Sequence, residues 1–232
     1  MIESKVVSLL FADDTPDSRF LIQAYLRGLR LVITFAENGL EAVQAYENTE
    51  FDLLLMDIEM PGLSGPNALA EIRKWEVVRG LPTVPAISLS GHDEVSGFDH
   101  HLKKPVKKAQ LLELLMRIFP SISDLAVDLM ATSLDDEIRA LMPTYLENRE
   151  KDLMNLSEAL RVGNFDQCAS IFHRIRGTAA SYGFPSIGKI AERGEQYSNQ
   201  SDWNSLHLAL RSFRSEIARQ RAGLSTPAMP LK

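Results

Sequence analysis

The chain has 232 residues, of which 45% are hydrophobic, and it carries a formal net charge of −6. This length fits one large or two small domains with ordinary hydrophobic cores. The acidic balance and the lack of any Lys- and Arg-rich block argue against nucleic acid as a direct ligand. Residues 1–120 hold 12 basic and 17 acidic side chains, a net of −5, so most of the acidic excess is N-terminal.

The compartment is indicated by cysteine use and by hydrophobic run length. A single cysteine, Cys168, excludes an internal disulfide and fits a reducing compartment. The apolar run at 6–12 is short for a secretion signal and continues directly into two aspartates. No segment approaches the length needed to span a membrane. We therefore expect a cytoplasmic chain without a membrane partner.

The N-terminal half alternates short apolar runs with segments of helical spacing. The apolar runs predict strands, at 6–12, 31–36, 51–56 and 84–89, and the helical spacing predicts helices between and after them, at 16–28, 40–46, 67–78 and 111–119. This alternation favours an α/β fold with a doubly wound parallel sheet. In such sheets, functional sites form at the carboxyl ends of the strands.

The C-terminal part shows no strand signal. Helical spacing with short turns predicts an all-α, antiparallel four-helix bundle, with helices at 134–160, 165–182, 186–197 and 203–221. We expect Pro143 to kink or split the first of these helices. The predicted organisation is therefore a first domain at 1–120, a linker at 121–133, a second domain at 134–222 and a flexible tail at 223–232.

Acidic side chains follow two of the predicted strands. Asp13 and Asp14 come directly after the first strand, and Asp57 follows the third. We expect these carboxylates to meet at one edge of the sheet, together with Ser90 after the fourth strand. Clustered carboxylates repel one another, and a hard divalent cation relieves that repulsion through oxygen ligands.

Four motifs in this half occur in the order found in a known family. They are Phe-Ala-Asp-Asp at 11–14, Met-Asp-Ile-Glu-Met-Pro-Gly at 56–62, Pro-Ala-Ile-Ser-Leu-Ser at 85–90, and Lys-Lys-Pro at 103–105. Together they resemble the receiver domain of two-component response regulators, over roughly residues 4–119. The resemblance implies a five-stranded, flavodoxin-like sheet.

The resemblance also implies a role for each matched residue. Asp57 would be the phosphoacceptor. Mg²⁺ would be held by Asp13, Asp14, Asp57 and the backbone carbonyl of Glu59. Lys104 and the hydroxyl of Ser90 would hold phosphoryl oxygens, as their charge and hydrogen-bonding capacity allow.

Two departures from the family pattern stand out. His101 occupies the place, three residues before Lys104, where receivers usually carry a switch Tyr or Phe. Only residues 91–103 separate Ser90 from Lys104, which is short by about two helical turns at ~3.6 residues per turn. We expect the fourth helix to be a stub or absent, so the family's usual dimerisation and output face is not carried over. His92 is expected in the loop after Ser90, where it would tune phosphoaspartate lifetime, and the His100–His101 pair is expected to be structural.

A histidine lies off the apolar stripe of the predicted helix at 165–182. The stripe predicts that His173 faces solvent, with Arg176 and Gly177 on the same outer face. An arginine there can pair with a phosphate, and a glycine leaves room beside the ring for a partner protein.

The segment from His173 to Gly183 resembles the His-x-x-Lys-Gly-Ser-Ala core of histidine phosphotransfer (HPt) domains, with Arg176 in place of the more usual Lys. Residues 190–192 also suit that family's next helix, and the resemblance covers about 134–222. It implies that His173 carries phosphate.

Together the two resemblances imply a phosphorelay protein. Asp57 would accept a phosphoryl group from a partner histidine kinase, and His173 would pass phosphate to or from a receiver aspartate. The chain shows no kinase ATP-binding segment, so its partners would be a histidine kinase, another receiver domain, or both. The receiver would itself catalyse Mg²⁺-dependent transfer and autodephosphorylation.

Three alternatives stay open. The chain could be a phosphate sink, a phosphate-independent binding module, or a hydrolase with an aspartyl nucleophile. A hydrolase usually has a second acid two positions after the nucleophile, and Glu59 fits that place only loosely.

Overall fold

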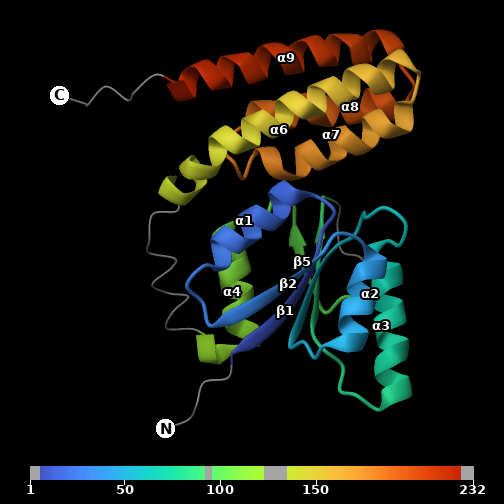
Figure 1. The fold of residues 1–232 in the computed structure, drawn as a ribbon, viewed down its shortest axis with the longest axis vertical. Coiled ribbons are helices and arrows are strands. Elements are labelled where there is room, and N and C mark those ends of the chain that lie inside the picture. The colour runs from blue at the N-terminus through green and yellow to red at the C-terminus, as the bar shows by residue number, and fades with distance from the viewer. Residues whose placement is uncertain (1–5, 92–95, 123–134, 226–232) are drawn as a thin grey trace, which may run out of the picture. The chain divides into compact units, whose positions relative to one another are not determined.

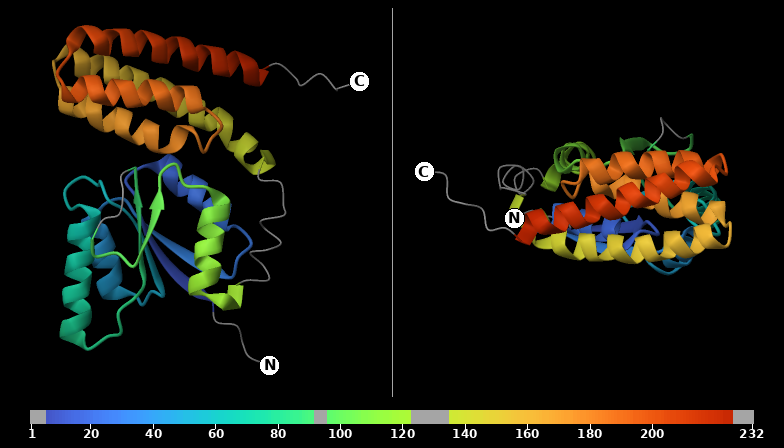
Figure 2. Two further views of the ribbon diagram at one scale, coloured as in Figure 1. Left: turned by 180° about the vertical axis from the view of Figure 1, so that it is seen from behind. Right: turned by 90° about the horizontal axis from the view of Figure 1, so that it is seen from above.

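A computed structural model of the protein describes residues 6–91, 96–122 and 135–225. The chain divides into two compact units, residues 1–134 and 135–232, which are described separately below (Figures 1 and 2). Among the described helices, none is long and apolar enough to cross a membrane.

The N-terminal unit is a five-stranded parallel sheet with strand order β2-β1-β3-β4-β5. This confirms the doubly wound α/β fold expected from the sequence. Figure 1 shows α1 and α4 on one side of the sheet and α2 and α3 on the other. The elements are β1 (Val7–Ala12), α1 (Pro16–Leu26), β2 (Leu31–Ala36), α2 (Gly39–Asn48), β3 (Leu53–Asp57), α3 (Gly65–Arg79), β4 (Ala86–Ser90), β5 (His100–Lys103), α4 (Lys108–Ile118) and the 3₁₀ turn η1 (Pro120–Ile122).

The central strands are apolar on both faces because helices cover both of them. Leu10 of β1, Leu54 of β3 and Ala86 of β4 pack into one core with α2 and α3. The parallel register pairs Ala12 with Met56. Asp13 and Asp57, each one residue further on, therefore lie at the same edge of the sheet.

The connection between β4 and β5 is short, as predicted. Among its described residues, Gly91 and 96–99, none is helical; residues 92–95, which include His92, lie outside the described residues. Asp99 joins this connection to its neighbours, because its Oδ2 accepts the Ala86 N–H at 2.8 Å and an Arg73 N–H from α3 at 3.3 Å. Phe98 packs against the core of the α2 and α3 face. These contacts of Asp99 and Phe98 hold the start of β5 in place, although none of the described residues of the connection is helical.

The described residues of the C-terminal unit form four helices, α6 (Asp135–Arg161), α7 (Phe165–Ala179), α8 (Pro185–Asn199) and α9 (Trp203–Ser225), which confirms the predicted bundle (Figure 2). Of the two outcomes expected at Pro143, a split of the first helix is wrong, because α6 runs through this residue, and a kink stays a prediction. A proline inside a helix removes one backbone donor, and its ring crowds the carbonyl four residues earlier, so packing must offset that cost. Tyr145 and Leu146 just after it are buried in the bundle and keep the helix packed.

The predicted tail at 223–232 starts too early. Helix α9 continues to Ser225, and residues 226–232 lie outside the described residues. Glycine at 223 lowers helix propensity but does not end a helix.

Helices α7 and α8 approach closely through a glycine. A Cβ added to Gly194 of α8 would lie 2.6 Å from ring carbons of Phe172, which is itself fully buried on α7. A glycine inside a helix costs about 0.5–1 kcal/mol relative to alanine, so its presence here reflects the space taken by the aromatic ring.

Replacing Gly194 with alanine should therefore destabilise the C-terminal unit by about 1–3 kcal/mol, through overpacking against Phe172. The matched control is Gly188→Ala in the same helix, where the new Cβ would meet Ala179 at an ordinary 3.5 Å. That control should be neutral or slightly stabilising. Urea denaturation of both variants measures the difference, and equal stabilities would contradict this packing.

Candidate functional site

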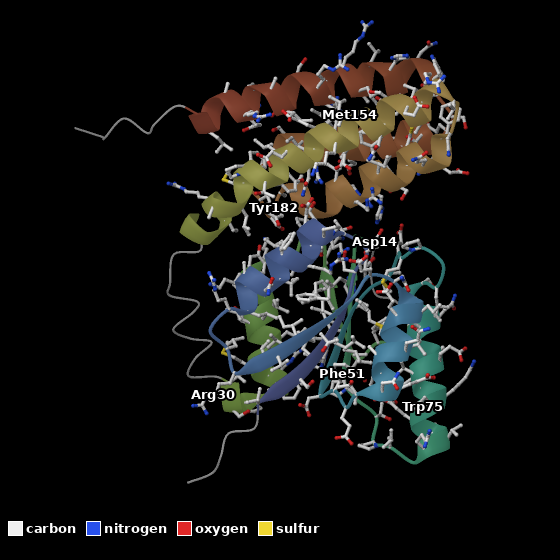
Figure 3. All side chains as sticks on the ribbon, viewed as in Figure 1. Asp14, Arg30, Phe51, Trp75, Met154 and Tyr182 are labelled. Atoms are coloured by element: carbon white, nitrogen blue, oxygen red, sulfur yellow. The ribbon has the colours of Figure 1, made fainter. Side chains whose placement is uncertain are left out.

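Three carboxylates gather at the carboxyl edge of the sheet. Asp13 follows β1, Asp57 ends β3, and Asp14 lies beside them; Figure 3 shows Asp14 at this end of the sheet. One oxygen from each residue lies within 4.8 Å of the others. Asp13 and Asp57 are buried, whereas Asp14 is half-buried. The geometry thus places together the three acids that the sequence singled out.

A single lysine bridges two of these acids. The Lys104 Nζ lies 2.8 Å from Asp57 Oδ2 and 3.2 Å from Asp13 Oδ2. Burial alone would lower the pKa of Lys104, but the two carboxylates outweigh that effect and raise it. The amine is therefore charged and offsets one of three negative charges when all three acids are ionised. The remaining charge suits a divalent cation with oxygen ligands.

The first turn of α1 fixes Asp13 in position. Its Oδ1 accepts the Thr15 N–H at 2.8 Å, and its Oδ2 accepts the Ser18 hydroxyl at 2.6 Å. Arg19 donates to the Asp13 backbone carbonyl at 2.6 Å and also pairs with Glu37. Sequence reasoning missed these three supports. The hydroxyl of Ser18 was the available signal, since Ser side chains often hydrogen-bond at the start of a helix.

Asp57 sits in a desolvated position. Burial raises the pKa of its carboxyl to about 6; the charges of Asp13 and Asp14 add to this rise, and Lys104 opposes it. The chain after Asp57 folds back so closely that a Cβ added to Gly65 would lie 2.1 Å from the Asp57 backbone carbonyl oxygen. Only glycine fits this approach, so Gly65 is a further residue of the site that the sequence did not reveal.

The C-terminal unit holds a second cluster, between α7 and α8. His173 Nδ1 lies 2.9 Å from Glu195 Oε1, and the same carboxylate pairs through Oε2 with Arg176 Nε at 3.0 Å. The expectation of a solvent-facing His173 is wrong, because its side chain is only 16% exposed. Glu195 reaches it from the neighbouring helix, a contact that the periodicity of α7 alone cannot show.

The carboxylate decides which ring nitrogen of His173 carries the proton. A carboxylate accepts hydrogen bonds, so Nδ1 must be the N–H donor to Glu195. An Arg176 nitrogen also lies 3.3 Å from Nδ1, but two donors cannot bond to each other, and the shorter contact goes to Glu195. In the neutral ring, Nε2 is then left with the lone pair and is the nucleophilic atom.

Both units match known protein families. Residues 9–116 match the response regulator receiver domain, and residues 140–223 match the Hpt domain. The chain joins a receiver domain to an Hpt domain.

Similar proteins include parts of much longer chains. The sensor protein GacS of Pseudomonas syringae pv. syringae is 26% identical over 86% of this chain and 25% of its own length. The signal transduction histidine-protein kinase BarA of Escherichia coli K12 is 24% identical over 84% of this chain and 24% of its own. The chain thus spans about a quarter of these curated relatives.

Among solved structures, the receiver domain of sensor histidine kinase PA1611 from Pseudomonas aeruginosa PAO1 is 31% identical, with a TM-score of 0.45. The match covers 50% of this chain and 99% of that one. That crystal structure has a magnesium ion coordinated in its active site cleft.

Other predicted residues of the receiver domain fall at or near the acid cluster. Ser90 is buried at the end of β4, one residue past the Leu89 that pairs with Asp57, and its carbonyl accepts the Lys104 N–H at 2.7 Å. Glu59 is exposed in the loop after Asp57, and the use of its carbonyl as a ligand stays a prediction.

The two histidines of β5 lie among structural contacts. His101 Nδ1 is 2.9 Å from the Ser88 hydroxyl of β4, and His100 Nδ1 is 3.5 Å from an Arg117 nitrogen. Among the described residues, the three aspartates are the group whose geometry fits a metal ion, and neither histidine belongs to it.

The tautomer of His173 is directly measurable. In ¹⁵N-labelled protein at a pH where the ring is neutral, Nδ1 should show the chemical shift of a protonated nitrogen, and Nε2 should show that of an unprotonated nitrogen. Glu195→Ala should shift the ring toward the opposite tautomer, which is usual for free histidine, and Glu192→Ala on the same helix serves as the control. A protonated Nε2 in the unmodified protein would contradict the assignment.

Proposed function

We propose that this chain is a phosphorelay protein in which Asp57 and His173 each carry a phosphoryl group. The observation that carries the proposal is the arrangement at Asp57, a buried carboxylate 2.8 Å from the Lys104 ammonium, with two further acids beside it. His173, held on one nitrogen by Glu195, supplies the complementary site in the same chain.

We propose Mg²⁺ as the cofactor of the receiver domain. Asp13, Asp14 and Asp57 would hold it, together with the backbone carbonyl of Glu59, and hard oxygen donors of this kind suit Mg²⁺. When bound, the ion supplies positive charge that shields phosphoryl oxygens from the carboxylates. The fit rests on the excess of three clustered acids over a single buried ammonium.

At Asp57 the reaction is a transfer between two nucleophiles. An Asp57 oxygen forms the new O–P bond while the N–P bond of a phosphohistidine donor breaks, and that electron pair returns to the imidazole nitrogen. Lys104 would neutralise one phosphoryl oxygen, and the Ser90 hydroxyl would donate a hydrogen bond to another. Phosphoryl transfer needs mainly positioning and charge neutralisation, which these residues provide.

At His173 the transfer needs no proton movement. The Nε2 lone pair forms the N–P bond while the O–P bond of a phosphoaspartate breaks, and the electron pair stays on the leaving carboxylate. The ring keeps its Nδ1 proton and becomes positively charged. Glu195, which lies 2.9 Å from Nδ1, would stabilise that charge, and Arg176, which pairs with the same carboxylate, would add positive charge near the phosphoryl group.

The partners we propose are a histidine kinase, another receiver domain, or both. The relatives named above are sensor proteins and kinases, and this chain matches the receiver and Hpt families. We propose a cytoplasmic location for both domains, in keeping with the buried free thiol of Cys168.

Mg²⁺ binding should stabilise the receiver domain. At a concentration about 100 times its Kd, the ion should add about 2.7 kcal/mol to the free energy of unfolding. Asp14→Asn should raise stability without metal, because it removes a repelling charge, and should abolish the response to Mg²⁺. Glu59→Gln is the control, since only its backbone is expected to bind. Thermal melts with MgCl₂ and with EDTA measure this, and an unresponsive wild type would refute the metal site.

Transfer between the two sites is tested by mixing variants. His173→Ala protein is first labelled on Asp57 with a small phosphoramidate donor, freed of donor, and mixed with Asp57→Ala protein. The label should move to His173 of the second protein as acid-labile phosphate. Asp57→Ala protein treated with donor alone measures direct labelling, and His173→Gln protein in place of the acceptor should gain none. A label that stays on Asp57 or is lost to water would contradict transfer between molecules.

A further inference from the structure

The two edges of the receiver sheet differ in chemistry. Strand β5, at one edge, has four residues and includes two histidines and a lysine. Strand β2, at the other edge, has six residues, Leu-Val-Ile-Thr-Phe-Ala, without a charge or a proline. Charged residues, prolines and short length are the usual protection of an edge strand against pairing with another chain. Strand β2 lacks all three.

The hydrogen bonds at both ends of β2 show which backbone groups face outward. Val7 N–H donates to the Arg30 carbonyl at 3.0 Å, and Asp13 N–H donates to the Ala36 carbonyl at 3.1 Å. In a parallel ladder, the residues facing the neighbour alternate, so the even-numbered residues of β2 face β1. Ile33 and Phe35 therefore turn their N–H and C=O groups away from the sheet, where the described residues provide no further strand.

Each face of this edge carries an exposed apolar side chain. Val32 lies on the α2 and α3 face, because it pairs in register with Ser8 and so shares the face of Leu10, and it is 59% exposed. Phe35 lies on the opposite face, in register with Phe11, and is 37% exposed. An approaching strand would thus meet exposed apolar side chains on both faces as well as the outward backbone groups.

We propose that β2 is a self-association edge, at which two copies of this chain pair their β2 strands antiparallel about a two-fold axis at Thr34. Ile33 then exchanges both backbone hydrogen bonds with Phe35 of the partner subunit. Thr34 lies opposite Thr34 of the partner subunit, as a pair without backbone hydrogen bonds.

The existing hydrogen bonds select this register. Pairing centred on Ile33 would require the Leu31 N–H, which already donates to the Leu29 carbonyl at 2.9 Å. Pairing centred on Phe35 would require the Glu37 N–H, which already donates to Glu41 Oε2 at 2.8 Å. The register centred on Thr34 pairs the outward groups of Ile33 and Phe35 and needs neither of these.

The side chains favour a second copy as the occupant, because this register is complementary to itself. It places Ile33 opposite the aromatic ring of Phe35 in the second copy, and the hydroxyl of Thr34 opposite that of the second Thr34. Both kinds of cross-strand pair are stabilising. An edge of six residues is small, so the association should be weak and dependent on concentration.

Cysteine cross-linking in the full chain tests the register. In pairs without backbone hydrogen bonds the Cα atoms are about 4.5 Å apart, within disulfide range. Thr34→Cys should therefore form a disulfide-linked dimer on mild oxidation. In the control, Val32→Cys, the two thiols would be offset by about 13 Å along the strands. The native Cys168 is buried, and burial raises the pKa of its thiol to about 11, which keeps it unreactive.

The dimer yield of Thr34→Cys should exceed that of Val32→Cys at least tenfold. Equal yields, or no dimer from Thr34→Cys, would overturn the proposal. A charge swap covers the case in which the cysteine variant misfolds: Thr34→Lys and Thr34→Glu should each sediment as monomers, and their mixture as a dimer. A monomeric mixture, or association only with a different protein's strand, would equally overturn it.

Discussion

The receiver domain depends on one electrostatic arrangement, in which a buried ammonium faces more carboxylates than it can neutralise. Lys104 reaches Asp57 and Asp13 from the segment after β5, while Asp14 stands beside them. Gathering carboxylates in a buried position costs free energy, and this cost is visible at Asp57, where burial raises the pKa of the carboxyl to about 6. A chain selected only for stability would not keep such a cluster, so its cost marks the functional edge of the sheet.

The surrounding structure fixes the positions of these carboxylates. The start of α1 secures Asp13 through Thr15 and Ser18, and Gly65 lets the chain after Asp57 fold back against it. The Hpt domain applies the same principle with a different group. There Glu195 fixes the proton on one nitrogen of His173, so the other nitrogen is ready to react without a proton transfer. Burial and neighbouring charges thus set the proton affinity of Asp57, and a carboxylate sets the tautomer of His173.

Sequence alone predicted the parts of this account that follow from short-range patterns. Strand-end positions predicted that Asp13, Asp14 and Asp57 would meet, and the short spacing before Lys104 predicted a β4–β5 connection without a full helix. The remainder depends on contacts between elements. The stripe on α7 misplaced His173 in solvent because Glu195, on another helix, covers it, and no local pattern shows that Gly65 must touch Asp57. The helix through Pro143 likewise depends on tertiary packing that outweighs local propensity.

The central claim is that one chain carries phosphate on two chemically different residues, and ³¹P NMR tests it most directly. The full chain with Mg²⁺ and a phosphoramidate donor should give an acyl phosphate resonance, removed by hydroxylamine, and a phosphoramidate resonance on the protein, removed by acid. Asp57→Ala should lose the first and His173→Gln the second. A spectrum of the unmodified chain with neither resonance, or with resonances that persist in both variants, would contradict the account.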